Sequence, residues 1–136
     1  MLNTLQNPLS FVGRMLLAML FIPAGVGKIS GFAGTVGYIA SSGVSFPELA
    51  AVAAIFIEVG LGFMLLVGFQ ARWAALGIAV FTVVITFIFH RFWEVPAAQM
   101  VQQQQAFFKN IAVVGGLLTV AAWGAGAWSF DAKRSA

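Results

Sequence analysis

Cysteine is absent from this sequence of 136 residues, and histidine occurs once, at position 90. A chain without cysteine has no disulfide, no thiol relay and no cysteine-ligated zinc or iron–sulfur centre of its own. One histidine also falls short of the two axial nitrogens of a common haem site, so the sequence predicts no intrinsic metal site. Any redox role must therefore depend on a bound cofactor or on a partner protein.

Charged residues are also scarce, at 8% of the chain, whereas 61% of the residues are hydrophobic and the mean hydropathy is +0.98. A soluble domain contains about 25% charged residues, because its surface must be covered. The net charge of +3 comes from basic residues spread along the chain, without the clustered patch of a nucleic-acid-binding protein. The sequence therefore predicts an integral membrane protein in contact with the lipid bilayer.

Four hydrophobic segments are long enough to cross the bilayer core, which takes about 20 helical residues. They predict spans at about residues 10–27, 47–69, 73–90 and 108–129. The connections between them are short, and no segment has the composition of a soluble domain. The predicted fold is an all-α integral membrane four-helix bundle, with one transmembrane domain over residues 1–136.

The segment between the first and second spans has its own helical pattern. Phe32, Val36 and Ile39 recur at helical spacing, but the segment is too short and too polar at its end to cross the membrane. We expect a short helix that lies at the membrane interface.

The charges flanking the spans predict the topology. No basic residue precedes the first hydrophobic segment, as it would in a secretory signal peptide, so we expect this segment to remain as a span. An even number of spans puts both termini on one side. That side has four basic residues and the other has three: Arg14, Arg72, Lys133 and Arg134 against Lys28, Arg91 and Lys109. The positive-inside rule then favours cytoplasmic termini, by a margin of one charge.

Two charged residues fall inside the predicted spans, Arg14 in the first and Glu58 near the centre of the second. A carboxylate at that depth costs about 3 kcal/mol on insertion scales, so Glu58 needs a partner. Helical rise puts Glu58 roughly 16 Å from Pro47 and Arg14 roughly 21 Å from Lys28. If Pro47 and Lys28 mark the same interface, Arg14 and Glu58 lie at similar depth and form an ion pair. Such a pair either fixes helix register alone or takes part in function.

Thr82, Thr86 and His90 share one face of the third span by four-residue steps. In one interpretation both threonines donate hydrogen bonds to their own helix backbone, as is common in membrane helices. In the other they form a cavity wall that leads from His90 towards Glu58.

Polar residues from three helix ends are predicted to reach the membrane side opposite the termini: Lys28, His90, Arg91, Lys109 and Asn110. They would form a cationic, titratable mouth for a quinone headgroup, an anion or the acidic surface of a partner. Glu58 and His90 are the candidate catalytic residues, and Lys28, His90, Lys109 and Asn110 are the candidate cofactor-binding residues. The alternative for the basic residues is ordinary interfacial anchoring.

Four segments are characteristic in combination: GVGKISGFAGTVGYIASSGVSFP, IEVGLGFMLLVGFQARWAAL, FHRFW and FFKNIAVVGGLL. Through them the chain resembles the DoxX family of small bacterial four-helix membrane proteins, from Arg14 to Trp128. The resemblance implies an inner-membrane protein of the group that includes membrane subunits of thiosulfate:quinone oxidoreductase. The residues to which its pattern points are Arg14, Lys28, Glu58, Arg72, His90, Lys109 and Asn110.

The leading hypothesis is a multi-pass protein of the bacterial inner membrane that supports quinone-linked electron transfer as a subunit of an oxidoreductase complex. Quinone would be its cofactor and a redox partner protein its source of electrons; whether the chain itself is catalytic stays open. A second hypothesis makes the region of Arg14 and Glu58 part of a proton or small-solute pathway, which in so narrow a bundle would need a homo-oligomer. A third is a membrane scaffold or assembly protein.

Overall fold

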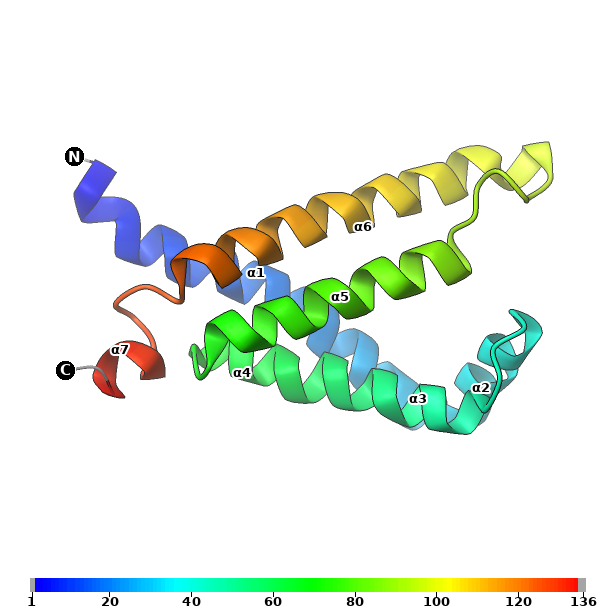
Figure 1. The fold of residues 1–136 in the computed structure, drawn as a ribbon, viewed down its shortest axis with the longest axis horizontal. Helices are drawn as coiled ribbons and strands as arrows, with labels where there is room; N and C mark the ends of the chain where they lie inside the picture. Colours follow the sequence, from blue (N-terminus) through cyan, green and yellow to red (C-terminus); the bar gives the residue numbers. More distant parts are fainter. Residues whose placement is uncertain (1, 135–136) are drawn as a thin grey trace.

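A computed structural model describes residues 2–134, and these residues are folded entirely as helices and connecting turns. Four helical segments are long and apolar enough to cross a membrane: Asn3–Ser30, Pro47–Val67, Ala71–Phe89 and Ala97–Trp123. They run alternately up and down the long axis, and both ends of the described chain lie at the same end of the bundle (Figure 1). The predicted all-α membrane bundle with four spans is confirmed.

The helical elements follow one another with few intervening residues. In chain order they are α1 (Leu2–Ser30), α2 (Phe32–Ser41), α3 (Pro47–Ile55), η1 (Phe56–Leu61), α4 (Gly62–Val67), α5 (Ala71–Phe89), α6 (Ala97–Trp123) and α7 (Phe130–Arg134). The element η1 is a π-helix, and it joins α3 and α4 into one continuous span. Such wider turns are rare and are frequently found at functional sites.

The short helix predicted between the first two spans is confirmed as α2. It packs beside α3, and its Tyr38 ring stacks on Phe89 at the end of α5, with ring centroids 5.2 Å apart. The hydroxyls of Ser41 and Ser42 both donate to the Tyr38 carbonyl, which satisfies the end of the helix. Residues far apart in the sequence are thereby held together at the end of the bundle away from the termini.

Two of the long helices have bounds that differ from the predicted spans. Helix α1 begins at Leu2, and Pro8 lies within it. Helix α6 begins at Ala97 because Pro96 precedes it in an extended conformation, and it includes the four consecutive glutamines at 102–105, which lie before the predicted span at 108–129. Glutamine is a good helix former, so polarity alone does not end a helix there. The end of α6 is set by Gly124, whose φ is +87°.

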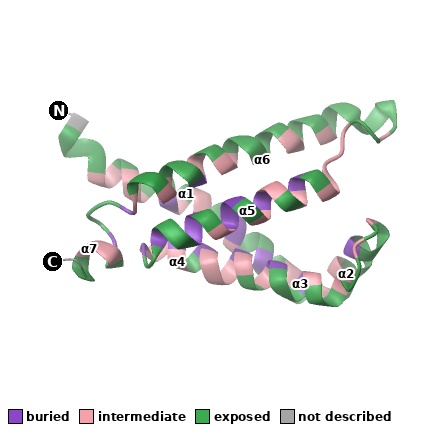
Figure 2. Cartoon of the chain, viewed as in Figure 1, coloured by how far each residue is buried: buried purple, intermediate pink, exposed green. Residues whose placement is uncertain are grey.

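The core lies where α5 meets α4, α1 and α6. Its buried members are mostly small residues of α5 together with a few larger ones: Phe21, Leu65, Ala74, Ala75, Ile78, Ala79 and Leu117. Small side chains allow membrane helices to approach closely. The burial colouring in Figure 2 shows the buried stripe of α5 facing inward, while the outward surfaces of the long helices are exposed. Those outward surfaces carry large apolar side chains, as contact with lipid requires.

Replacing Gly25 by alanine should destabilise the bundle. An added Cβ would lie 2.6 Å from Val59 Cγ2 and 2.9 Å from Glu58 Cβ, so α1 would have to move away from η1. We expect the free energy of unfolding to fall by about 1–3 kcal/mol, as in other overpacked sites, with a lower thermal midpoint in detergent. Gly27→Ala is the matched control, because a Cβ there meets nothing within 4 Å. Equal stability of the two variants would contradict this close approach.

Candidate functional site

An ion pair between Lys28 and Glu58 joins α1 to η1. The Lys28 ammonium donates to both carboxylate oxygens of Glu58, with Nζ–Oε1 and Nζ–Oε2 distances of 2.9 and 2.8 Å. The Glu58 side chain is 5% exposed, whereas the Lys28 side chain keeps 29% of its surface open. The carboxylate is therefore enclosed, and its lysine partner lies between it and the surroundings.

The local sequence explains how the two side chains meet. Gly25 has no side chain, so the backbone of α1 comes against Glu58 and Val59. Lys28 follows Gly25 by three residues and therefore lies on nearly the same face of α1, one turn further along. The wide turn of η1 carries Glu58 in its first turn. Together, the glycine and the π-helix set the register in which Lys28 reaches the carboxylate.

The predicted ion pair between Arg14 and Glu58 is wrong. Arg14 is only 1% exposed, and its guanidinium binds backbone carbonyls. Nη1 donates to Leu65 and Leu66 at the end of α4, at 2.9 and 2.8 Å. Nε donates to Ala125 at 3.0 Å and Nη2 to Trp128 at 2.6 Å, both in the segment after α6.

The error in the predicted pair lies in the assumed depths. Gly25 is level with Glu58, so Arg14 lies roughly 16 Å away from that level along α1, on the side of the termini. Lys28 and Pro47 do not mark one plane, since Pro47 lies further from the Gly25–Glu58 level than Lys28 does. The offset removes Arg14 from the reach of Glu58 and puts Lys28 in its place.

A second set of polar contacts joins α5 to α6. The Asn110 amide donates to Thr86 Oγ1 at 3.0 Å, and His90 Nδ1 lies 2.9 Å from Gln103 Oε1. Thr86 in turn donates to the Thr82 carbonyl. These bonds fix the α5–α6 register at the end away from the termini.

The prediction that both threonines bond to their own backbone is confirmed. Thr82 Oγ1 donates to the Ile78 carbonyl at 2.7 Å, and Thr86 Oγ1 to the Thr82 carbonyl at 2.6 Å. Both threonines are almost completely buried. Neither side chain therefore forms the open wall of a path from His90 to Glu58.

The structure divides the residues of the predicted cationic mouth among separate contacts. Lys28 binds Glu58, whereas His90 and Asn110 bind within the α5–α6 pair. Arg91 forms a surface ion pair with Glu94, and Lys109 is exposed on α6. Within residues 2–134, no hydrogen bond or ion pair joins Lys28 to the other four.

Sequence reasoning missed two contributors to these contacts. Gln103 was placed in a connection, although Gln103, Phe107 and Asn110 follow the three- and four-residue steps of one helical face. Gly25 was not singled out, although a small residue one turn from Lys28 indicates close helix approach. No sequence pattern marks the π-helical turn.

The fold and the interior ion pair define a multi-pass, all-helical membrane protein. The family model of DoxX matches residues 9–91. The chain is 33% identical to inner membrane protein YphA of Escherichia coli, over 92% of this chain and 89% of that protein. It is 39% identical to inner membrane protein YqjF of the same organism, over 88% and 87%. The protein belongs to the DoxX family of inner-membrane proteins.

A more distant similarity reaches a eukaryotic protein. The Surfeit locus protein 4 homolog of Schizosaccharomyces pombe is 33% identical over 52% of this chain, which corresponds to 24% of that protein. No solved structure matches the chain. The relatives thus identify the family and the inner membrane. The cytoplasmic side of the termini stays a prediction.

Replacing Arg14 by methionine should strongly destabilise the protein. The change removes the donors for carbonyls of α4 and of the segment after α6, at a site where Arg14 itself is only 1% exposed. We expect a loss of at least about 3 kcal/mol in the free energy of unfolding, because hydrogen bonds from charged groups contribute roughly 1.5–3 kcal/mol each. Unfolding in mixed detergent, followed by circular dichroism, measures the loss.

Arg91→Met is the control for this experiment, because its ion pair with Glu94 is exposed. A surface pair contributes about 0–1 kcal/mol, so this variant should resemble the wild type. Arg14→Lys should recover only part of the stability, since one ammonium cannot reproduce the fork of donors. An Arg14→Met protein as stable as Arg91→Met would refute the structural role of Arg14.

Proposed function

We propose that the protein is a membrane subunit supporting quinone-linked electron transfer, and that a quinone headgroup binds at Lys28 and Glu58. The observation that carries the proposal is the asymmetric exposure of the pair, with an enclosed carboxylate and a lysine that stays partly open. An ionisable residue within a membrane span is costly and is retained for function by default. The family and the inner-membrane relatives are compatible with this role.

The donor set at Lys28 fits a quinone headgroup. An ammonium has three N–H donors and no acceptor, and two of the donors of Lys28 are directed at Glu58. The third is available to a carbonyl oxygen at the open side of the lysine. Glu58 fixes the direction of the ammonium, so the lysine presents this donor in a defined orientation.

The pair can also hold a proton for exchange. Quinone reduction takes up protons together with electrons, and the cofactor supplies that redox chemistry. The Lys28 ammonium donates to the Glu58 carboxylate, so the pair places a proton-bearing group directly against a proton acceptor. Electrons must come from a partner protein, because the chain has no cysteine with which to ligate a cluster. His90 and Asn110 then serve as positioning residues that hold α5 against α6.

A scaffold or assembly role is the second candidate. The observation that favours it is that Arg14, His90 and Asn110 bind within the chain and tie helices together. In that role the Lys28–Glu58 pair would fix the register of α1 against η1 alone. A test must therefore separate loss of quinone from loss of a partner protein.

Glu58→Gln should reduce the quinone that co-purifies with the protein in native-lipid nanodiscs. The amide keeps the shape of the side chain but leaves the Lys28 ammonium without its counter-charge. We expect roughly a tenfold loss of bound quinone per protein, since a charge-assisted hydrogen bond contributes about 1.5–3 kcal/mol. Solvent extraction with chromatographic quantification of quinone provides the measurement.

Glu48→Gln is the matched control, because Glu48 lies exposed in the first turn of α3. This variant should retain wild-type quinone content. Partner proteins recovered with Glu58→Gln should stay unchanged if quinone binding is the role of the pair. Equal amounts of quinone recovered from Glu58→Gln and Glu48→Gln would refute the proposal and favour the scaffold. So would the absence of quinone from the wild type and both variants.

A measurement of proton flux tests the transport hypothesis. Flux through liposomes that contain the wild type, abolished by Glu58→Gln, would favour transport instead.

A further inference from the structure

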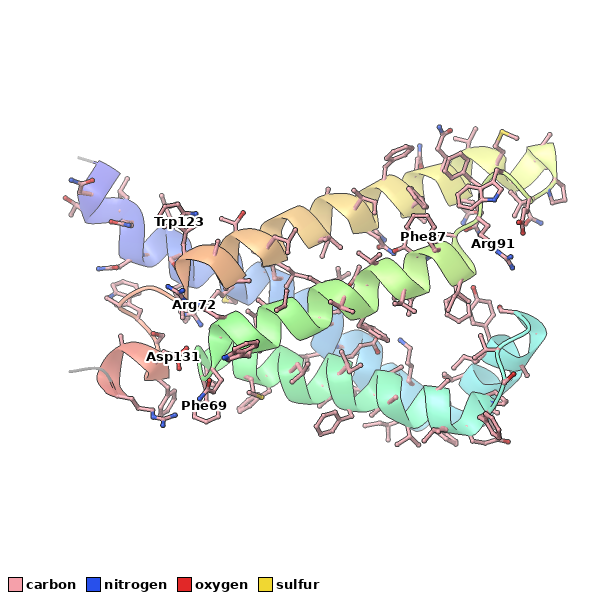
Figure 3. All side chains as sticks on the ribbon, viewed as in Figure 1. Phe69, Arg72, Phe87, Arg91, Trp123 and Asp131 are labelled. Atoms are coloured by element: carbon pink, nitrogen blue, oxygen red, sulfur yellow. The ribbon has the colours of Figure 1, made fainter. Side chains whose placement is uncertain are left out.

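A hollow of about 540 Å³ lies at the end of the bundle that carries both termini, away from the Lys28–Glu58 pair. Its walls come from the start of α5, the segment after α6, and α7. The polar and charged side chains that line it include Gln70, Arg72, Ser129, Asp131 and Arg134. Figure 3 shows Arg72, Asp131 and Phe69 around the space between α7 and the start of α5.

The hollow has fixed walls. The Asp131 carboxylate accepts hydrogen bonds from the backbone N–H groups of Gln70 and Ala71, at 2.8 and 2.9 Å. The Asp131 N–H donates to the Gly68 carbonyl at 2.9 Å, so α7 is tied to the turn before α5. At the segment after α6, the Arg72 side chain lies against Gly124, where an added Cβ would be 3.3 Å from Nε.

Two arginines give the hollow its positive charge. Arg72 and Arg134 both line it and are exposed, and neither forms an ion pair or donates a hydrogen bond within residues 2–134. The guanidinium of Arg134 lies over the Phe69 ring, 5.5 Å from its centroid, which limits the positions it can take. Asp131 is the acidic residue in the lining, and its carboxylate faces the backbone of α5.

The position of the hollow relative to the membrane surface indicates which anion it binds. Trp73 lines it and is largely exposed, and Trp123 and Trp128 are exposed on neighbouring segments. Tryptophan gathers at the boundary between lipid and water, so the hollow lies at the level of lipid headgroups. The planar guanidinium of arginine has paired N–H donors whose spacing matches the oxygens of a phosphate. We infer that this hollow binds the phosphate of an anionic phospholipid, with Arg72 and Arg134 as its ligands.

The test compares lipid binding by the full chain and by R72Q/R134Q, in which both ligands are neutral. Protein stripped of lipid in neutral detergent is titrated with phosphatidylglycerol, and bound lipid is counted by native mass spectrometry. We expect the double variant to bind phosphatidylglycerol roughly tenfold more weakly, because it loses charge-assisted hydrogen bonds. Arg91→Gln, which changes a partly exposed arginine at the opposite end, is the matched control and should bind as the wild type does.

Competing ligands identify the source of the phosphate. Phosphatidylglycerol that outcompetes both phosphatidylcholine and inorganic phosphate supports a site for anionic lipid. Inorganic phosphate that displaces the lipid at equal concentration would overturn the lipid assignment. Equal affinity of R72Q/R134Q and Arg91→Gln for phosphatidylglycerol would overturn the site itself. If the double variant does not fold, Arg134→Gln alone is compared with Arg91→Gln for affinity to phosphatidylglycerol. Arg134 lies at the end of the described chain, and equal affinity of these two variants would likewise overturn the site.

Discussion

The guanidinium of Arg14 satisfies backbone carbonyls at the end of the bundle that carries both termini. A buried carbonyl that water cannot reach costs free energy unless the protein supplies a donor, so irregular backbone beside a buried site needs donors from side chains. Helix α4 ends at Val67, and the segment after α6 has no regular structure. One side chain from α1 binds carbonyls from both segments. The arrangement of α1, α4 and the C-terminal segment thus depends on a single fork of donors.

The two interior charges of the bundle have different kinds of partner. Arg14 lies roughly 16 Å from the level of Glu58 and binds carbonyls, so Glu58 takes its counter-charge from Lys28. The two ends of the bundle consequently differ in what their interior charges bind. At the termini end the interior charge binds backbone dipoles, which exchange no proton. At the other end two ionisable side chains face each other, and one of them remains partly open. Within residues 2–134, the buried acid–base pair is therefore Lys28 and Glu58.

The sequence was sufficient for the fold because hydrophobic length and low charge leave few alternatives to a four-span bundle. The short helix α2 and the backbone bonds of Thr82 and Thr86 were also predictable, because residues close together in the sequence decide them. The partner of Glu58 was not predictable in this way. It depends on the offset between α1 and α3, which the contact at Gly25 and the π-helix η1 set together. Neither feature leaves a periodic signal in the sequence.

The region that the DoxX model matches shows how the two charged regions relate to the family. Residues 9–91 contain Lys28 and Glu58, together with the glycine and the π-helix that bring them together. The carbonyls of Ala125 and Trp128 that Arg14 binds lie outside that region, as does Arg134. The segment after α6, together with α7, therefore completes the hollow that we propose to bind phosphate, whereas the ion pair is built wholly from the matched part.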